Sequence, residues 1–230
     1  MKNCLKLSVL AAVLVASATL ASAESIQLGS YATGASSQGN SNTAMNFAGF
    51  STSPVISGGV GTSYFLDPLN VWAPAVPNST WVGYSSSAGP GGTNPATGFY
   101  TFTTNFTALT TLPYAGSISV MADDTTSVYL NGTLIVAFGA LGTDSHCADG
   151  LPTCSIVDTV PLSGLSLLSG VNANQLTFVV QQAGDQAPHL DPSGVDFEAT
   201  LTAVPEPNTL LMLGTGLMGS AGALFRRMRS

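Results

Sequence analysis

The central part of the sequence, residues 24–203, contains no lysine and no arginine. The five basic residues of the 230-residue chain lie near its ends: Lys2, Lys6, Arg226, Arg227 and Arg229. Of the twelve acidic residues only Glu206 lies outside residues 24–203, so that region carries eleven acidic side chains. Nucleic-acid binding needs cationic side chains against phosphates, and P-loop and Schiff-base chemistry each need a lysine. These functions are excluded, as is a basic patch on an acidic membrane, whereas cations remain suitable partners.

Cysteine and histidine are also scarce, with three and two copies. Cys4 lies in a segment that we expect to be removed, which leaves Cys147 and Cys154 as a pair. An even pair in an exported chain predicts a local disulfide that closes the loop between them. A zinc site would need further ligands, and His146 and His189 are the two histidines of the chain.

The N-terminal segment has the three-part plan of a secretory signal peptide. A basic start is followed by the apolar run Leu7–Leu20 and by Ala21-Ser22-Ala23, whose small residues suit signal peptidase. The run is too short to cross a hydrocarbon core of roughly 30 Å comfortably. We expect cleavage after Ala23, so that residues 1–23 are the leader and Glu24 begins the mature protein. An uncleaved membrane anchor is the alternative.

The C-terminal segment predicts a transmembrane helix at about 208–225. This stretch carries no charge and is followed at once by Arg226 and Arg227. At about 1.5 Å per residue it would cover roughly 27 Å, just enough for a thin bilayer. Because positive charge stays cytoplasmic, we expect the C-terminus inside and the body outside. Before the helix, Pro205-Glu206-Pro207 keeps the chain extended and accessible to a processing enzyme.

This combination resembles the PEP-CTERM protein-sorting signal of Gram-negative bacteria. The matching features are Pro205, Glu206 and Pro207, the apolar helix and the stop formed by Arg226 and Arg227, so the signal covers residues 204–230. The resemblance implies recognition by an exosortase, cleavage near the motif, and release or attachment at the cell surface. Transient anchoring in the inner membrane would precede processing.

Residues 24–203 have the length of one domain and a strand-rich pattern. Apolar residues alternate with polar ones in 100–106, 117–122, 176–181 and 195–202. Asn131-Gly132 between two apolar runs predicts a hairpin. Weaker strand candidates are 25–28, 44–50, 54–60 and 80–84, with a long loop at 86–98 and a short helical turn at 161–170. The pattern predicts an all-β fold, an antiparallel β-sandwich or jelly roll.

The stretches GFYTFTTNF, ISVMADDTTSVYLNGTLI and NQLTFVVQQAG, followed by GVDFEATLTA, resemble galactose-binding-like jelly rolls of exported bacterial proteins. The resemblance spans roughly residues 98–202. It implies the fold, but it does not define a ligand, because such modules bind varied sugars.

Acidic residues form two candidate metal-binding groups. Asp123 and Asp124 precede the hairpin, where they either bind Ca²⁺ through oxygen atoms or stabilise a turn. A second loop supplies Asp185, Asp191 and Asp196, and spacing alone does not tell whether the two groups share a site.

Aromatic residues supply a candidate sugar site. Trp72 and Trp81 flank a proline-rich loop, and with Tyr84 and Tyr100 they would either stack on sugar rings or fill the core. Asp196 and Glu198 are expected on the wet face of an edge-like last strand, where paired carboxylates could serve a glycosidase but more often face solvent.

The sequence therefore predicts a non-enzymatic, exported β-sandwich protein of the cell surface or extracellular matrix, acting in adhesion, biofilm formation or exopolysaccharide association. The alternatives are a Ca²⁺-dependent carbohydrate-binding module and a secreted glycosidase-like enzyme. The expected partners are signal peptidase and exosortase during export and a surface polysaccharide afterwards, with no nucleic acid.

Overall fold

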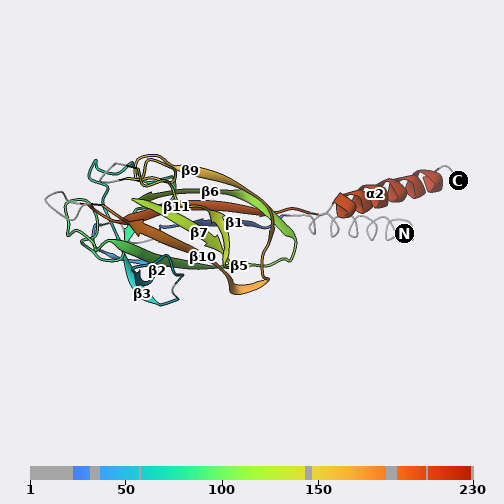
Figure 1. Ribbon diagram of the computed structural model, residues 1–230. Helices are drawn as coiled ribbons and strands as arrows, with labels where there is room; N and C mark the ends of the chain where they lie inside the picture. The colour runs from blue at the N-terminus through green and yellow to red at the C-terminus, as the bar shows by residue number, and fades with distance from the viewer. Residues whose placement is uncertain are drawn as a thin grey trace.

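The computed structural model describes residues 23–31, 37–56, 58–142, 147–184, 191–205 and 207–228, with side chains in the last segment from residue 214. Within these residues it contains eleven strands and one long helix (Figure 1). The strands are β1 (Ser25–Gly29), β2 (Ser41–Ser51), β3 (Gly61–Phe65), β4 (Val82–Gly83), β5 (Gly98–Ala108), β6 (Pro113–Asp123), β7 (Thr125–Leu130), β8 (Thr133–Val136), β9 (Asp158–Ser166), β10 (Gly170–Gln182) and β11 (Gly194–Ala203). The helix is α2 (Pro207–Met228).

The strands form an antiparallel sheet that folds over into two layers (Figure 1). The strand order is β8-β7-β10-β5-β2-β3-β4-β11-β6-β9, with β1 beside β11. Strands from the two halves of this order face each other across the core. Phe178 of β10 and Phe197 of β11, for example, have ring centroids 4.4 Å apart. The expected antiparallel β-sandwich is therefore confirmed.

The main core consists of the apolar positions that alternate along the central strands. Phe102 of β5, Val120 of β6, Phe178 of β10 and Phe197 of β11 are each buried in it. The opposite face of β5 is also covered, since Thr103 is buried as well. Alternation thus identified the core residues, although the polar face of a central strand is not always wet.

The predicted hairpin joins β7 and β8. Asn131 and Gly132 adopt positive φ angles of 49° and 82°, which suit the tight turn that this dipeptide favours. The Asn131 side chain also donates a hydrogen bond to Asn174 Oδ1 at 2.9 Å, and this contact ties the turn to β10. The local sequence and the tertiary contact therefore support the same conformation.

Three local predictions are wrong. Residues 161–170 do not form a helical turn, because Asp158–Ser166 pairs with β6 as β9, and Pro161 fits this edge strand since an edge position needs no inward amide donor. The described residues of 54–60 do not form a strand; β3 begins at Gly61. The last strand is not at an edge, because β11 lies between β6 and the strands β1 and β4.

The two ends of the chain differ in how much the structure shows. The helix expected at 208–225 is present as α2, which extends from one end of the sandwich (Figure 1). Among the described residues, no helix is long and apolar enough to cross a membrane, so the transmembrane role of α2 stays a prediction. Ala21 and nearly all of the expected leader lie outside the described residues, as does Glu206 of the sorting motif.

The contact between the two layers should dominate the stability of the body. Phe178→Ala should lower the free energy of unfolding by about 3–5 kcal/mol, because it leaves a cavity against Phe197. Leu134→Ala on β8 is the matched control; its side chain is 51% exposed and should change the stability little. Urea denaturation measures both, and equal effects of the two substitutions would contradict this account of the core.

Candidate metal centre

Three aspartates meet at one end of the sandwich. Asp123 ends β6, Asp124 links β6 to β7, and Asp191 lies just before β11. All three are buried, and each offers a carboxylate oxygen within 4.8 Å of the others. The structure therefore joins the two acidic groups that the sequence left separate: Asp191 comes to Asp123 and Asp124, whereas Asp185 lies outside the described residues.

The register of two strands produces this meeting. Asp123 on β6 pairs with Gly194 on β11, and Asp191 lies three residues before Gly194. The chain segment that carries Asp191 is held by its amide, which donates to Asn94 Oδ1 at 2.8 Å. The β6–β11 pairing and the contact with Asn94 therefore bring the carboxylates together in the folded chain.

Neutral donors orient the first two carboxylates. The indole Nε1 of Trp72 donates to Asp123 Oδ2 at 2.5 Å, and the backbone amide of Ala183 donates to Asp124 Oδ2 at 2.6 Å. These two bonds hold the carboxylates of Asp123 and Asp124 in place.

Gln182 adds a further buried polar group beside the centre. Its side chain is 1% exposed, and its amide nitrogen lies 3.5 Å from the backbone oxygen of Asp191. Its Oε1 is buried and accepts no hydrogen bond in the described part of the chain. An amide oxygen of this kind can serve as a ligand for a hard cation.

The electrostatics of the cluster favour a bound cation. Three close carboxylates repel one another, and burial makes their ionised forms costly. The chain supplies no lysine or arginine between residues 24 and 203 to compensate this charge. Carboxylate and amide oxygens are the ligands that Ca²⁺ prefers, so the donor set fits the calcium predicted for Asp123 and Asp124.

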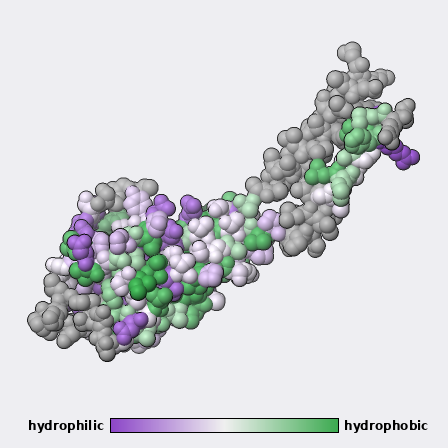
Figure 2. Space-filling view, turned by 90° about the horizontal axis from the view of Figure 1, so that it is seen from above, coloured by the Kyte–Doolittle hydropathy of each residue, from purple (hydrophilic) through white to green (hydrophobic). Residues whose placement is uncertain are grey.

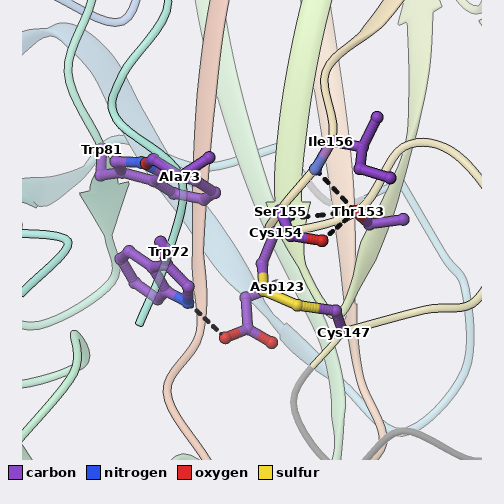
Figure 3. Close-up of a disulfide and its surroundings, with 9 residues drawn as sticks. All are labelled: Trp72, Ala73, Trp81, Asp123, Cys147, Thr153, Cys154, Ser155 and Ile156. Atoms are coloured by element: carbon purple, nitrogen blue, oxygen red, sulfur yellow. Dashed lines mark hydrogen bonds between the residues drawn. A yellow bond between two sulfur atoms is a disulfide. The ribbon is translucent and has the colours of Figure 1, made fainter. Parts of the chain in front are cut away.

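A disulfide closes the loop beside this centre, as the sequence predicted. Cys147 and Cys154 are bonded and pack in a small second core near Trp72 (Figure 3). The Ala148 amide donates to the backbone oxygen of Asp124 at 3.2 Å. The disulfide loop therefore contacts the backbone of the acidic centre directly.

The two tryptophans belong to this second core. Trp72 and Trp81 are 3% and 0% exposed, and their rings stack with centroids 4.4 Å apart (Figure 3). The Trp81 indole donates to the Ala73 backbone oxygen at 2.9 Å. Because neither ring presents a face to solvent, the structure does not support their predicted stacking on a sugar. Tyr100 is likewise buried, and Tyr84 stacks on it.

Asp196 does not face solvent, contrary to the expectation for a wet strand face. It is fully buried and accepts hydrogen bonds from Ser30 Oγ at 2.9 Å and from the Val76 amide at 2.7 Å. Desolvation raises the pKa of Asp196, and these hydrogen bonds only partly offset that rise. Asp196 is therefore a structural link between β11 and the loop that carries Val76, not the exposed partner of Glu198.

Comparison with known proteins identifies the C-terminal segment. Residues 203–229 match the family model described as the PEP-CTERM protein-sorting motif. The chain ends in a PEP-CTERM sorting motif. This motif implies an exported protein that an exosortase processes and that is transiently anchored in a membrane. It contains the predicted motif residues Pro205, Glu206 and Pro207, together with Arg226 and Arg227.

Likenesses to solved structures are weak. A β-glucosidase from Kluyveromyces marxianus is 13% identical over 75% of this chain and 21% of its own, with a TM-score of 0.29. The carbohydrate-binding module CBM36 in complex with calcium and xylotriose is 7% identical over 76% of this chain and 97% of its own, with a TM-score of 0.27. This chain thus spans about a fifth of the β-glucosidase. No curated protein matches the chain. These TM-scores are too low to carry an argument about ligand or activity.

The raised pKa of Asp196 predicts a specific pH dependence. The folded protein favours the protonated acid, so this group contributes stability below the ordinary pKa of 3.8 and loses that contribution as pH rises through its raised folded value. Asp196→Asn stays uncharged throughout. Urea denaturation across this pH range should therefore show the natural chain losing stability relative to the variant. Asp67→Asn, which removes an exposed carboxylate, is the control, and parallel curves for the natural chain and Asp196→Asn would contradict the assignment.

Proposed function

We propose that this protein is a non-enzymatic, calcium-binding β-sandwich that acts at the cell surface in association with exopolysaccharide. The observation that carries the proposal is the group of three buried carboxylates in a body that has no lysine or arginine. The sorting motif supplies the route, because it belongs to exported proteins. Calcium sites of extracellular modules bind the ion weakly, with Kd values of about 10⁻⁴–10⁻³ M. Export to a compartment where such sites work is therefore consistent with a calcium centre in this body.

The same features argue against catalysis. Asp196 and Glu198 were the candidate pair for glycoside hydrolysis, but Asp196 is buried and its two carboxylate oxygens accept bonds from Ser30 and Val76. A general acid or base must reach its substrate. Asp196 does not meet this requirement, and the proposal is therefore a binding protein.

The charge of the body favours an acidic or hydroxyl-rich polymer bridged by calcium. Eleven acidic side chains, with no lysine or arginine among them, would repel an acidic polysaccharide in the absence of a divalent cation. One Ca²⁺ ion at the Asp123, Asp124 and Asp191 centre would offset two of its three negative charges and so weaken this repulsion. The alternative is a Ca²⁺-dependent carbohydrate-binding module, whose ligand would be a defined sugar.

Calcium should stabilise the folded chain. At a concentration of about 100 times Kd it should add roughly 2.7 kcal/mol to the free energy of unfolding, and the melting temperature measures the change. Asp191→Asn should abolish this gain, because it removes one of the three carboxylates of the centre. Asp67→Asn, with an exposed carboxylate, should respond to calcium like the natural chain. Equal melting temperatures in calcium and EDTA would refute the metal centre.

A glycan and polysaccharide array, incubated with the full chain in calcium and in EDTA, tests the proposed partner. Binding to acidic polysaccharides in calcium, and its loss in EDTA or with Asp191→Asn, is the expected result. Calcium-dependent binding to defined neutral glycans instead would favour the carbohydrate-binding module. An array that stays blank in both conditions would exclude both forms of sugar binding.

A further inference from the structure

Four exposed aliphatic side chains lie at the end of the sandwich opposite the metal centre. Leu109, Leu168, Val171 and Val204 are 73%, 57%, 82% and 44% exposed. We call this group the tail-side rim. Three of the four side chains expose more than half of their surface, although each is purely aliphatic. Their common location therefore requires an explanation beyond chance exposure of single residues.

Hydrogen bonds place the first three rim residues on neighbouring loops. Ser169 Oγ donates to the Leu109 backbone oxygen at 3.4 Å, and the Asn172 amide donates to Thr107 Oγ1 at 3.0 Å. Leu109 follows β5, while Leu168 and Val171 flank the start of β10, which pairs with the end of β5. The rim is therefore one site built from two adjacent connections.

Both ends of the body also meet at the rim. The Leu109 amide donates to the two carboxylate oxygens of Glu24 at 3.0 Å each, and the Ala203 amide donates to the Glu24 backbone oxygen at 2.8 Å. The next residue, Val204, donates its amide to the Pro113 backbone oxygen at 2.7 Å. The body thus remains hydrogen-bonded up to Val204, within the segment that matches the sorting motif.

The link from the rim to the helix is very short. Pro205 and Glu206 lie between Val204 and the start of α2 at Pro207. Three residue steps span at most about 11 Å, whereas the polar layer on each side of a bilayer core is roughly 5–8 Å thick. In Figure 2 the coloured part of α2, from residue 214 onward, is mostly hydrophobic and lies beyond this end of the body. If α2 enters a membrane, the rim must lie at its surface.

We propose that the tail-side rim rests on the lipid surface of the membrane that holds the sorting tail, before the exosortase releases the body. This inference goes beyond calcium binding and depends on the membrane anchoring that the sorting motif implies. The rim would insert its aliphatic tips among the lipid headgroups. The metal centre, at the opposite end of β6, would point away from the membrane.

The chemistry of the rim favours lipid as the partner. The body has no lysine or arginine with which to hold an anionic leaflet electrostatically, so insertion of apolar side chains is the contact that remains. Burial of such side chains in the interface is favourable in proportion to their area. The nearest described acid, Glu24, is engaged by the Leu109 amide and by the Tyr114 hydroxyl and does not project as a free charge.

Fluorescent labels at the rim test the proposal. Leu109→Cys and Val171→Cys are each made in the full chain carrying Cys4→Ser, so that the introduced cysteine is the one thiol outside the disulfide. An environment-sensitive dye is attached, and the chain is reconstituted into phosphatidylethanolamine–phosphatidylglycerol vesicles containing spin-labelled lipid quencher. Val71→Cys is the matched control, because Val71 is 47% exposed and adjoins Trp72, which bonds Asp123 at the far end of β6.

Labels at positions 109 and 171 should show blue-shifted emission and lose much of it to the lipid quencher, while the label at position 71 keeps its emission. Identical spectra and quenching at all three positions would overturn the proposal, as would failure of the chain to float with the vesicles. The melting temperature in calcium, measured on the same labelled chains, reports the metal centre independently. A failed rim and a failed calcium site are therefore distinguishable.

Discussion

The structure depends on how three buried carboxylates are accommodated in a body that has no lysine or arginine. Asp123, Asp124 and Asp191 come from both sides of the β6–β11 pairing, and their mutual repulsion opposes that pairing unless a cation or protons compensate it. Trp72 orients Asp123, and the disulfide loop contacts the backbone of Asp124. The three carboxylates are therefore held by the ends of two central strands, by the second core and by the disulfide loop.

The molecule has two functionally different ends. Asp123 and Pro113 are the opposite ends of the eleven-residue strand β6, ten residue steps or about 33 Å apart. The metal centre lies at the first end, whereas the exit to the sorting motif and the exposed aliphatic rim lie at the second. This arrangement separates a segment used for delivery from a centre that would act after delivery.

Local patterns in the sequence predicted much of the fold. Asn131-Gly132 specified its hairpin, and the alternation around Phe178 and Phe197 identified two strands, because turn chemistry and strand periodicity act over a few residues. The burial of Asp196 depended on strand order instead. Asp196 is buried because β11 is central and the loop bearing Val76 covers it. The role of Asp191 depended on the pairing of Gly194 with Asp123, which no local spacing reveals.

The most direct test of the central claim is a crystal structure of the chain grown in calcium, with an anomalous difference map calculated at a wavelength where calcium scatters. The account predicts a peak among Asp123, Asp124 and Asp191, with oxygen ligands at about 2.3–2.6 Å. A map with no anomalous peak there, at saturating calcium, would contradict it.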